Sequence, residues 1–196
     1  MATFKVQFRI TNVRQRVGVI LYNITHNAEK TSVVTGINLP EKYWYKYKAS
    51  VVANNQTISY IDRIEADLLL LKLIDRRLSD KIKLYNVNEI SIRFNANNDE
   101  QGFLSYMCMQ ILKLIQFKKL GTANNYLHTL YSFMDFLDGY NIGIDCLTET
   151  LVERYDLYLL NRGLKRNSMS FYMRILRSVY NKAVKQRLVL QTNPFA

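Results

Sequence analysis

A polar stripe near the C-terminal end of the chain carries the residues best suited to bind a partner. Between Asn161 and Ala196 there are eight basic residues and no acidic residue. On a helix of about 3.6 residues per turn, five polar positions of this segment share one face. They are Ser170, Arg174, Arg177, Asn181 and Lys185. Basic side chains neutralise phosphates, and Arg and Asn can form paired hydrogen bonds with base edges. The spacing therefore predicts a helix face that fits a DNA major groove.

A second feature suited to a phosphate group precedes this stripe. Lys118 and Lys119 lie just before Thr122, which we expect to be a helix N-cap. Free backbone N–H groups and short polar side chains at such a start can hold a phosphate. In this half of the chain we expect these residues to contact DNA: Lys118, Lys119, Thr122, Asn124, Asn125, Lys165, Arg166, Asn167, Ser170, Arg174, Arg177 and Lys185.

The simpler interpretation, that the stripe is only a solvated helix face, stays open. Solvated faces normally alternate both signs of charge, because opposite charges one turn apart stabilise a helix and like charges destabilise it. This stripe carries like charges throughout. The sequence pattern thus favours a binding face.

No constellation for catalysis or metal binding stands out. His26, expected in a hairpin loop, and His128, on the polar side of a helix, have no Cys or carboxylate at ligand spacing. Cys108 and Cys146 are expected to be small buried residues in a reducing compartment. Phosphate-binding Gly-rich loops and hydrolase motifs are missing. We therefore expect no cofactor, no metal and no small-molecule substrate.

The overall charge supports a polyanionic partner. The 196 residues hold 27 Lys+Arg against 16 Asp+Glu, which gives a net charge of +11. Such an excess points to nucleic acid or to an anionic membrane surface. The N-terminus has no apolar signal-peptide core, and no apolar run approaches the roughly 18 residues of a membrane span. The sequence predicts a cytoplasmic protein without a membrane partner.

Residues 1–95 predict an α+β domain. Phe4, Val6, Phe8 and Ile10 alternate with polar residues, which is typical of a half-buried strand. Two further β-rich runs, 17–25 and 30–37, flank a four-residue polar loop and form a hairpin. Gly36, Asn38 and Pro40 are expected to end this small three-stranded antiparallel sheet. A covering helix is predicted over 59–79, and a short helix is predicted to start at Asn86.

Residues 100–193 predict a four-helix domain after a polar boundary at 95–101. The expected helices cover about 100–118, from Thr122 to about 138, from Thr148 to Gly163, and from Asn167 or Ser168 to about 187. The fourth helix should bury these residues: Met169, Tyr172, Met173, Leu176, Tyr180, Ala183 and Val184. The predicted fold is thus α+β followed by all-α.

An aromatic cluster lies between the sheet and the first helix. The segment Tyr43-Trp44-Tyr45-Lys46-Tyr47-Lys48 can serve as a base-stacking platform. The favoured interpretation is a loop in which Trp44 closes the end of the sheet while the tyrosines are exposed.

Several segments together resemble the tyrosine recombinases of the phage-integrase family. Gly121–Tyr126, Leu130–Leu137, Leu164–Arg177, Tyr180–Ala183 and Asn193-Pro194-Phe195 are similar to their core-binding, SAM-like domain. Gly18–Thr25, Ser32–Ile37 and Trp44 resemble the arm-binding domain of integrases from Bacteroides-type mobile elements.

The resemblance implies DNA as the partner, together with other integrase protomers assembled on it. Residues 1–95 would bind arm-type sites through the sheet, with contacts expected from Lys5, Gln7, Arg9, Arg14 and Arg16. Residues 100–193 would clamp a core-type site, and 194–196 would begin the hinge to a catalytic domain. Because the family's catalytic residues lie beyond that hinge, no catalytic residue is assigned, and this chain alone is expected to be inactive.

Three alternatives remain. The chain could be a DNA-binding regulator without recombinase activity. A sheet covered by a helix is also how double-stranded-RNA binders are built. Membrane-surface binding by the basic helix is disfavoured, because the apolar face of that helix is needed for the domain core.

Overall fold

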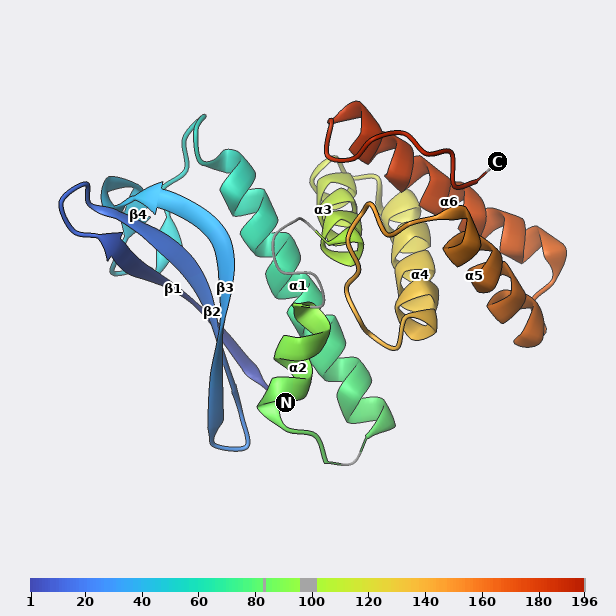
Figure 1. The fold of residues 1–196 in the computed structure, drawn as a ribbon, viewed down its shortest axis with the longest axis horizontal. Helices are drawn as coiled ribbons and strands as arrows, with labels where there is room; N and C mark the ends of the chain where they lie inside the picture. Colours follow the sequence, from blue (N-terminus) through green and yellow to red (C-terminus); the bar gives the residue numbers. More distant parts are fainter. Residues whose placement is uncertain (83, 96–101, 196) are drawn as a thin grey trace. The chain divides into compact units, whose positions relative to one another are not determined.

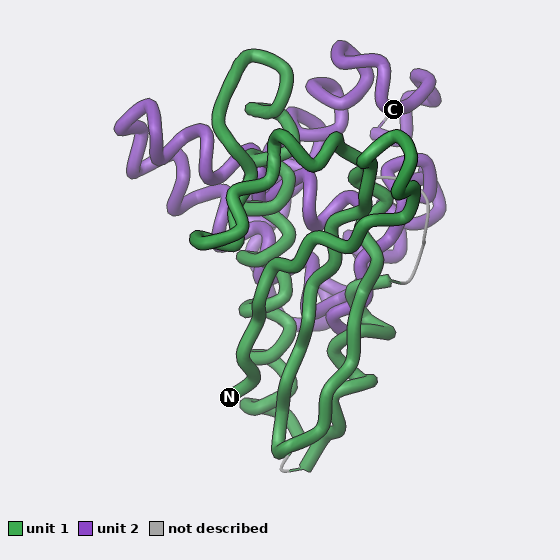
Figure 2. Tube along the Cα trace, turned by 90° about the vertical axis from the view of Figure 1, so that its left-hand side faces the viewer, with its two compact units in different colours: residues 1–95 green, residues 96–196 purple. Residues whose placement is uncertain are grey.

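The computed structural model describes residues 1–82, 84–95 and 102–195. Its contacts divide the chain between Asn95 and Ala96 into two compact units, called unit 1 and unit 2 below (Figure 2). The polar segment expected as a boundary lies outside the described residues except for Asn95.

Unit 1 is built around a three-stranded antiparallel sheet. Its strands are β1 (Thr3–Asn12), β2 (Val17–His26) and β3 (Glu29–Pro40), in the spatial order β1-β2-β3 (Figure 1). The predicted alternation holds from Phe4 to Phe8, whose apolar side chains are half-buried between exposed neighbours. It fails at Ile10, which is exposed together with the other residues at the end of β1.

The β2–β3 hairpin is tighter than predicted. Asn27 and Ala28 alone form the turn, both with left-handed backbone (φ 49° and 66°), as expected for a two-residue hairpin loop. The expectation of a loop position for His26 is therefore wrong. His26 pairs with Glu29 across the ladder, is buried, and stacks on Tyr85 with ring centres 4.3 Å apart.

Gly36 does not end the sheet, contrary to the sequence prediction. The β2–β3 register shifts between Val19 and Leu21, and Gly36 lies opposite that shift with a φ of +69°. This is a β-bulge, in which glycine adopts a left-handed conformation at little cost. The ladder then continues to Pro40, which pairs with Val17.

The described residues of unit 1 form two α-helices besides a short 3-10 turn, η1 (Glu41–Tyr43). Helix α1 (Ile58–Lys81) matches the predicted covering helix, and α2 (Val87–Phe94) matches the predicted short one. The Asn86 side chain accepts a hydrogen bond from the backbone N–H of Glu89 (3.1 Å), so the predicted N-cap is confirmed. A second sheet that the sequence did not predict pairs β4 (Trp44–Tyr45) with β5 (Ser50–Val51).

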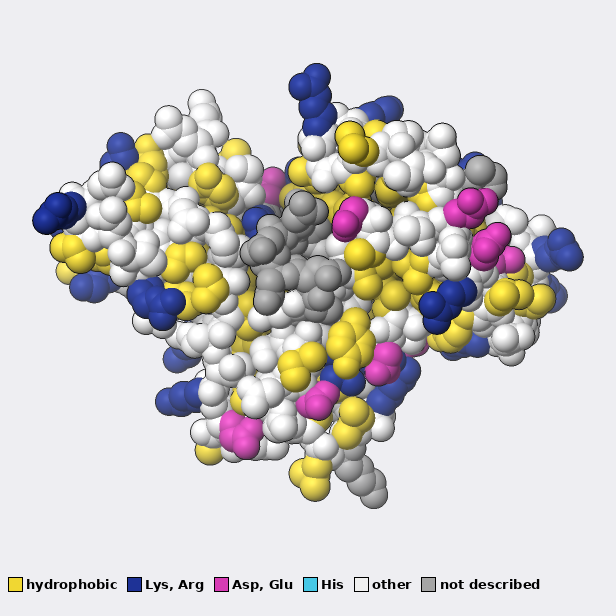
Figure 3. All heavy atoms as spheres, viewed as in Figure 1, with side chains coloured by type: hydrophobic (Ala, Val, Ile, Leu, Met, Phe, Trp, Pro, Cys, Tyr) yellow, Lys and Arg dark blue, Asp and Glu magenta, His cyan; other side chains and the backbone are white. Residues whose placement is uncertain are grey.

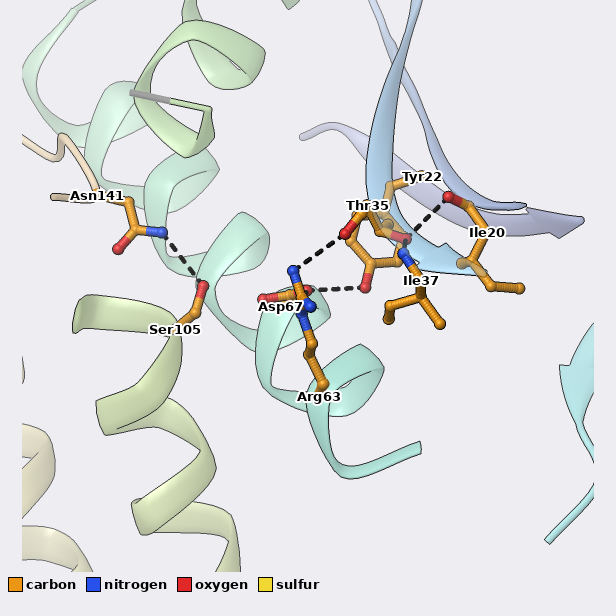
Figure 4. Close-up of polar contacts among 8 residues, drawn as sticks. All are labelled: Ile20, Tyr22, Thr35, Ile37, Arg63, Asp67, Ser105 and Asn141. Carbon is orange, nitrogen blue, oxygen red and sulfur yellow. Dashed lines mark hydrogen bonds and ion pairs between the residues drawn. The ribbon is translucent and has the colours of Figure 1, made fainter. Parts of the chain in front are cut away.

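Buried polar groups hold α1 against the inner face of the sheet (Figure 4). The Tyr22 hydroxyl donates to the Asp67 carboxylate at 2.9 Å, and Asp67 is only 4% exposed. Arg63 lies 3.8 Å from the same carboxylate and donates to the Thr35 carbonyl oxygen at 3.0 Å. Strands β2 and β3 are thereby tied to one helix through charged groups.

Unit 2 contains helices α3 (Phe103–Gln116), α4 (Leu120–Phe136), α5 (Glu149–Asn161) and α6 (Arg166–Lys185). The Thr148 hydroxyl caps α5 by accepting from the Leu151 N–H (3.3 Å), at the predicted start of the helix, and Gly163 follows α5 with a φ of +77°, where the helix was expected to end. The predicted burial of both cysteines holds for Cys108 but is wrong for Cys146, which is exposed in the α4–α5 connection.

The start of α3 is fixed by a buried asparagine from the α4–α5 connection (Figure 4). The Asn141 amide oxygen accepts from the Leu104 N–H at 3.0 Å, and its NH₂ group donates to the Ser105 hydroxyl at 3.3 Å. Gly102 makes room for this side chain, since a Cβ there would come within 2.0 Å of the amide. Phe133 and Tyr155 meet edge-to-face at 4.9 Å and join α4 to α5.

Candidate nucleic-acid interface

The polar stripe on α6 is exposed along its whole length. All five of its members are exposed to solvent: Ser170, Arg174, Arg177, Asn181 and Lys185. Met169, Leu176, Tyr180 and Ala183 are buried on the opposite side, as predicted. Tyr172, Met173 and Val184 are only half-buried, whereas Ile175 and Val179, which the prediction omitted, are buried. The core-facing side of α6 is therefore rotated slightly from the predicted one, and the stripe still faces solvent.

Helices α5 and α6 differ in the sign of the charges that they carry. Helix α5 carries exposed Glu149, Glu153 and Asp156, with Arg154 as its basic residue. Helix α6 carries no acidic residue. The lack of acids is thus a property of α6 and not of unit 2 as a whole, since Asp156 of α5 lines a pocket together with Arg166 and Ser170 of α6.

The stripe is not uniformly available, because the segment after α6 folds back onto it. Arg177 donates to the Phe195 carbonyl oxygen, and its guanidinium lies 5.7 Å from the centre of the Phe195 ring. Both Pro194 and Phe195 are buried. A pocket beside them is lined by Arg177 and Asn181, among others. Arg177 is therefore engaged within the chain, whereas the bond that Arg174 makes in the described part of the chain runs along its own helix, to the Ser170 carbonyl oxygen at 3.3 Å.

Tyr180 holds the same returning segment in place from the buried side of α6. Its hydroxyl donates to the Leu190 carbonyl oxygen at 3.1 Å and accepts from the Thr192 backbone N–H at 3.1 Å. We call residues 188–195 the C-terminal strap. No motif in the sequence signalled the strap, although Tyr180 and Asn193-Pro194-Phe195 were both part of the family resemblance.

The start of α4 lies one turn from where the sequence predicted it. Lys118 adopts a left-handed φ of 57°, so the chain turns directly from α3 into α4 and Lys119 becomes the N-cap. Thr122 is consequently the third residue of the helix and not its cap, which corrects the prediction. Lys118, Lys119, Thr122, Asn124 and Asn125 are all exposed.

Backbone N–H groups remain available at this helix start. The first backbone bond of α4 runs from the Ala123 N–H to the Lys119 carbonyl oxygen at 2.9 Å, so the N–H groups of Leu120, Gly121 and Thr122 have no partner within the helix. A Cβ added to Gly121 would meet nothing within 4 Å. An anion can therefore approach closely.

A lysine–tyrosine contact joins the second turn of α4 to the C-terminal half of α6. The Lys182 ammonium lies 5.1 Å from the centre of the Tyr126 ring and donates to its hydroxyl at 3.3 Å. The same hydroxyl meets Ser178 at 3.2 Å. The beginning of α4 and the polar stripe of α6, which the sequence analysis treated as separate features, are thus neighbours in unit 2. The prediction missed Tyr126 and Lys182 as the link between them.

The other end of α6 adds three more candidates. Lys165 is the N-cap residue, so α6 begins at Arg166, one or two residues before the predicted start at Asn167 or Ser168. Lys165, Arg166 and Asn167 are exposed. They lie about 18 Å along the helix axis from Ser178, at roughly 1.5 Å per residue. The candidate surface of unit 2 therefore extends over nearly the full length of α6.

In unit 1 the predicted sheet residues share the outer face. Lys5, Gln7 and Arg9 alternate with the half-buried residues of β1 and are exposed. The Gln7 amide oxygen accepts from Asn23 (2.6 Å), whose own oxygen accepts from Ser32 (2.7 Å). This polar ladder crosses all three strands. The sequence prediction did not include Asn23 or Ser32, because cross-strand register decides that they lie beside Gln7.

The two arginines of the β1–β2 turn differ in their surroundings. Arg16 forms an ion pair with Glu41 at 2.9 Å, and its carbonyl oxygen accepts from the Glu41 N–H at 2.7 Å. Arg14 is exposed. Arg16 therefore helps to attach the turn to η1, and Arg14 projects from it.

The pKa shifts of the buried tyrosines disfavour the nucleophilic phenolate form. Burial raises the pKa of Tyr106 to about 12, and burial also raises the pKa values of Tyr22 and Tyr155. A higher pKa favours the neutral phenol at physiological pH. The Tyr155 hydroxyl donates to the Ser132 hydroxyl at 2.8 Å, and the Tyr22 hydroxyl donates to Asp67 at 2.9 Å, so both are engaged within the fold.

Residues 102–196 match the family model of the phage integrase SAM-like domain. The match covers the described part of unit 2, including both the α4 start and α6. No curated protein and no solved structure matches the chain. Unit 2 is thus similar to a domain of phage integrases, which are tyrosine recombinases. Across residues 1–82, 84–95 and 102–195, no helix has the length and apolarity to span a bilayer.

Proposed function

We propose that the chain binds double-stranded DNA as the site-recognition part of a tyrosine recombinase acting in integration of a mobile element. In this proposal unit 2 binds a core-type site, and unit 1 binds an arm-type site through the outer face of its sheet. The observation that carries the proposal is the exposed, acid-free stripe of α6 inside the segment that matches the integrase SAM-like domain.

The physical argument rests on complementarity along one surface. Helix α6 presents Arg174, Asn181 and Lys185 to solvent, and the Tyr126–Lys182 contact places an open helix start beside it. Phosphates would meet the ammonium groups and the α4 backbone N–H groups, while Arg174 and Asn181 can reach base edges. The major groove of duplex DNA offers phosphates and base edges side by side.

The test compares two exposed arginines of unit 2. Arg174→Ala should weaken binding to a labelled duplex by about three- to tenfold near 100 mM salt, and should lower the slope of log K against log salt by about 1. Arg154→Ala removes the same charge from an exposed position on α5 and should change neither quantity. Fluorescence anisotropy at several salt concentrations measures both.

Two results would contradict the proposal. Equal effects of Arg174→Ala and Arg154→Ala would mean that the stripe is only solvated. Displacement of the DNA by an equal concentration of RNA duplex would favour the double-stranded-RNA alternative, because A-form RNA does not admit a helix into its major groove.

A further inference from the structure

The β4–β5 hairpin of unit 1 combines exposed aromatic rings with lysines. Its four-residue loop, 46–49, is closed by the bond from the Lys48 N–H to the Tyr45 carbonyl oxygen (3.2 Å), and Ala49 adopts a φ of 47°. Lys46, Tyr47 and Lys48 are exposed, and Tyr47 reaches 93%. The Tyr47 ring is therefore almost entirely available to a partner.

The base of the hairpin is anchored firmly to unit 1. Trp44 stacks on Phe8 of β1 with ring centres 5.7 Å apart and an interplanar angle of 26°. The Val52 N–H donates to the Tyr43 carbonyl oxygen at 2.8 Å, and the Thr57 hydroxyl donates to the Val52 carbonyl oxygen. The expected closing role of Trp44 thus coexists with exposed tyrosines on the same strand pair, although Trp44 and Tyr43 are half-buried.

The hairpin belongs to a basic end of unit 1. The Glu41–Arg16 bonds attach the β1–β2 turn to η1, directly before β4, so Arg14 projects from the same end. The acidic residue of η1, Glu41, is already paired with Arg16. Figure 3 shows Lys and Arg side chains gathered around the end of unit 1 where Figure 1 places β4. The basic residues there are Arg14, Arg16, Lys42, Lys46 and Lys48.

The ring geometry distinguishes between two nucleic-acid ligands. Lys42 covers the Tyr43 ring at 4.9 Å, and Lys48 lies over the Tyr45 ring at 5.6 Å. The Tyr45 and Tyr47 rings are tilted by 60°. Bases of a single strand stack on successive open ring faces. Here ammonium groups occupy two of the three rings, an arrangement better suited to phosphates of an intact duplex.

We propose that this hairpin is a further DNA-contact element, in which Lys46, Tyr47 and Lys48 grip the phosphate backbone of a duplex. The Tyr47 hydroxyl donates to a phosphate oxygen, and the two ammonium groups neutralise its neighbours. The proposal rests on the DNA binding proposed above. It adds a contact that none of the sheet residues supplies.

The experiment uses the 196-residue chain and a labelled 30-base-pair duplex of mixed sequence. Lys46→Ala/Lys48→Ala should lower affinity about tenfold near 100 mM salt and should lower the salt slope by about 2. Tyr47→Ala should lower affinity about threefold with little change of slope, because it removes no charge. The matched control, Lys72→Ala/Arg154→Ala, removes two exposed charges from α1 and α5 and should change neither value. Trp44 emission reports whether the hairpin remains anchored.

The outcomes distinguish the hairpin contact from the DNA binding proposed for the chain as a whole. Hairpin variants that bind like the control, in a chain that binds duplex DNA, overturn only the hairpin contact. Failure of the unaltered chain to bind any duplex overturns both proposals. A larger effect of Tyr47→Ala on a 20-nucleotide single strand than on the duplex assigns the hairpin to base stacking and overturns the backbone contact.

Discussion

Units 1 and 2 use charged side chains in different ways. Unit 1 buries Asp67, Asp75, Arg77 and Arg93, so part of its charge serves to hold helices and strands together. The polar residues buried in the described part of unit 2 are neutral: Ser105, Gln110, Thr129 and Asn141. The net charge of a unit therefore does not show how many of its charged side chains are available to a partner. The charge of unit 2 lies on its exterior, whereas unit 1 divides its charge between fold and surface.

The largest effect should come from removing a buried charge in unit 1. Asp67→Ala leaves the Tyr22 hydroxyl without its acceptor and Arg63 without its carboxylate, which should lower the free energy of unfolding of unit 1 by about 3–5 kcal/mol. Urea denaturation followed by Trp44 emission measures this, because the single Trp of the chain lies in unit 1.

The matched control for that change is Asp80→Ala on the same helix. Asp80 is 70% exposed and lies 4.0 Å from Arg76, so its loss should change stability by less than about 0.5 kcal/mol. A loss below about 1 kcal/mol in Asp67→Ala would show that the buried charges of unit 1 contribute little to its fold.

Alkaline pH should affect both units through their buried tyrosines. Burial raises the folded-state pKa values of Tyr22 in unit 1 and Tyr155 in unit 2 above the usual value of 10.0. The stability that each contributes is complete below pH 10. It declines above pH 10, as the unfolded-state phenol ionises, by up to about 1.4 kcal/mol per pH unit until the folded pKa is passed.

The prediction is checked by substituting one tyrosine in each unit. Tyr155→Phe should flatten the decline between pH 10 and 11 for unit 2, followed by far-UV circular dichroism. Tyr22→Phe should flatten it for unit 1, followed by Trp44 emission. A decline that is unchanged in both variants would mean that other groups govern the alkaline transition.

The smallest effect concerns the strap on α6. Phe195→Ala removes the ring beside Arg177 and loosens the carbonyl contact, which should free the guanidinium for a phosphate. Duplex affinity should rise about two- to threefold, with a slightly larger salt slope. Anisotropy titrations measure the change, and Leu190→Ala, which alters an exposed strap side chain, is the control. A fall in affinity would instead show that the strap supports the binding face.

Periodicity and local signals predicted much of the secondary structure. The helix cap at Asn86 was predicted because the capping bond spans only three residues and depends on local residue types. The bulge at Gly36 and the two-residue turn at Asn27–Ala28 were missed, because strand register depends on pairing across the sheet. The N-cap at Thr122 was wrong because the left-handed turn at Lys118 fixed the helix start earlier.

The candidate site likewise combines features that the sequence predicted with features that it could not predict. The exposed α6 stripe could be predicted, since a helix period alone puts Ser170, Arg174 and Lys185 on one face. The engagement of Arg177 by Phe195 could not, because it joins residues on separate segments that only folding brings together. The Gln7–Asn23–Ser32 ladder was hidden for the same reason.

By itself, the sequence determined the basic character of the chain, the amphipathic helices and the polar face of α6, because composition and helical spacing are local properties. Tertiary structure alone decided which of those charges remain available. Packing buried Asp67 against Tyr22, turned Arg177 toward the strap and exposed the lysines of the hairpin. Burial and pairing depend on neighbours distant in the chain, and the free energy of a charge depends on those neighbours more than on its residue type.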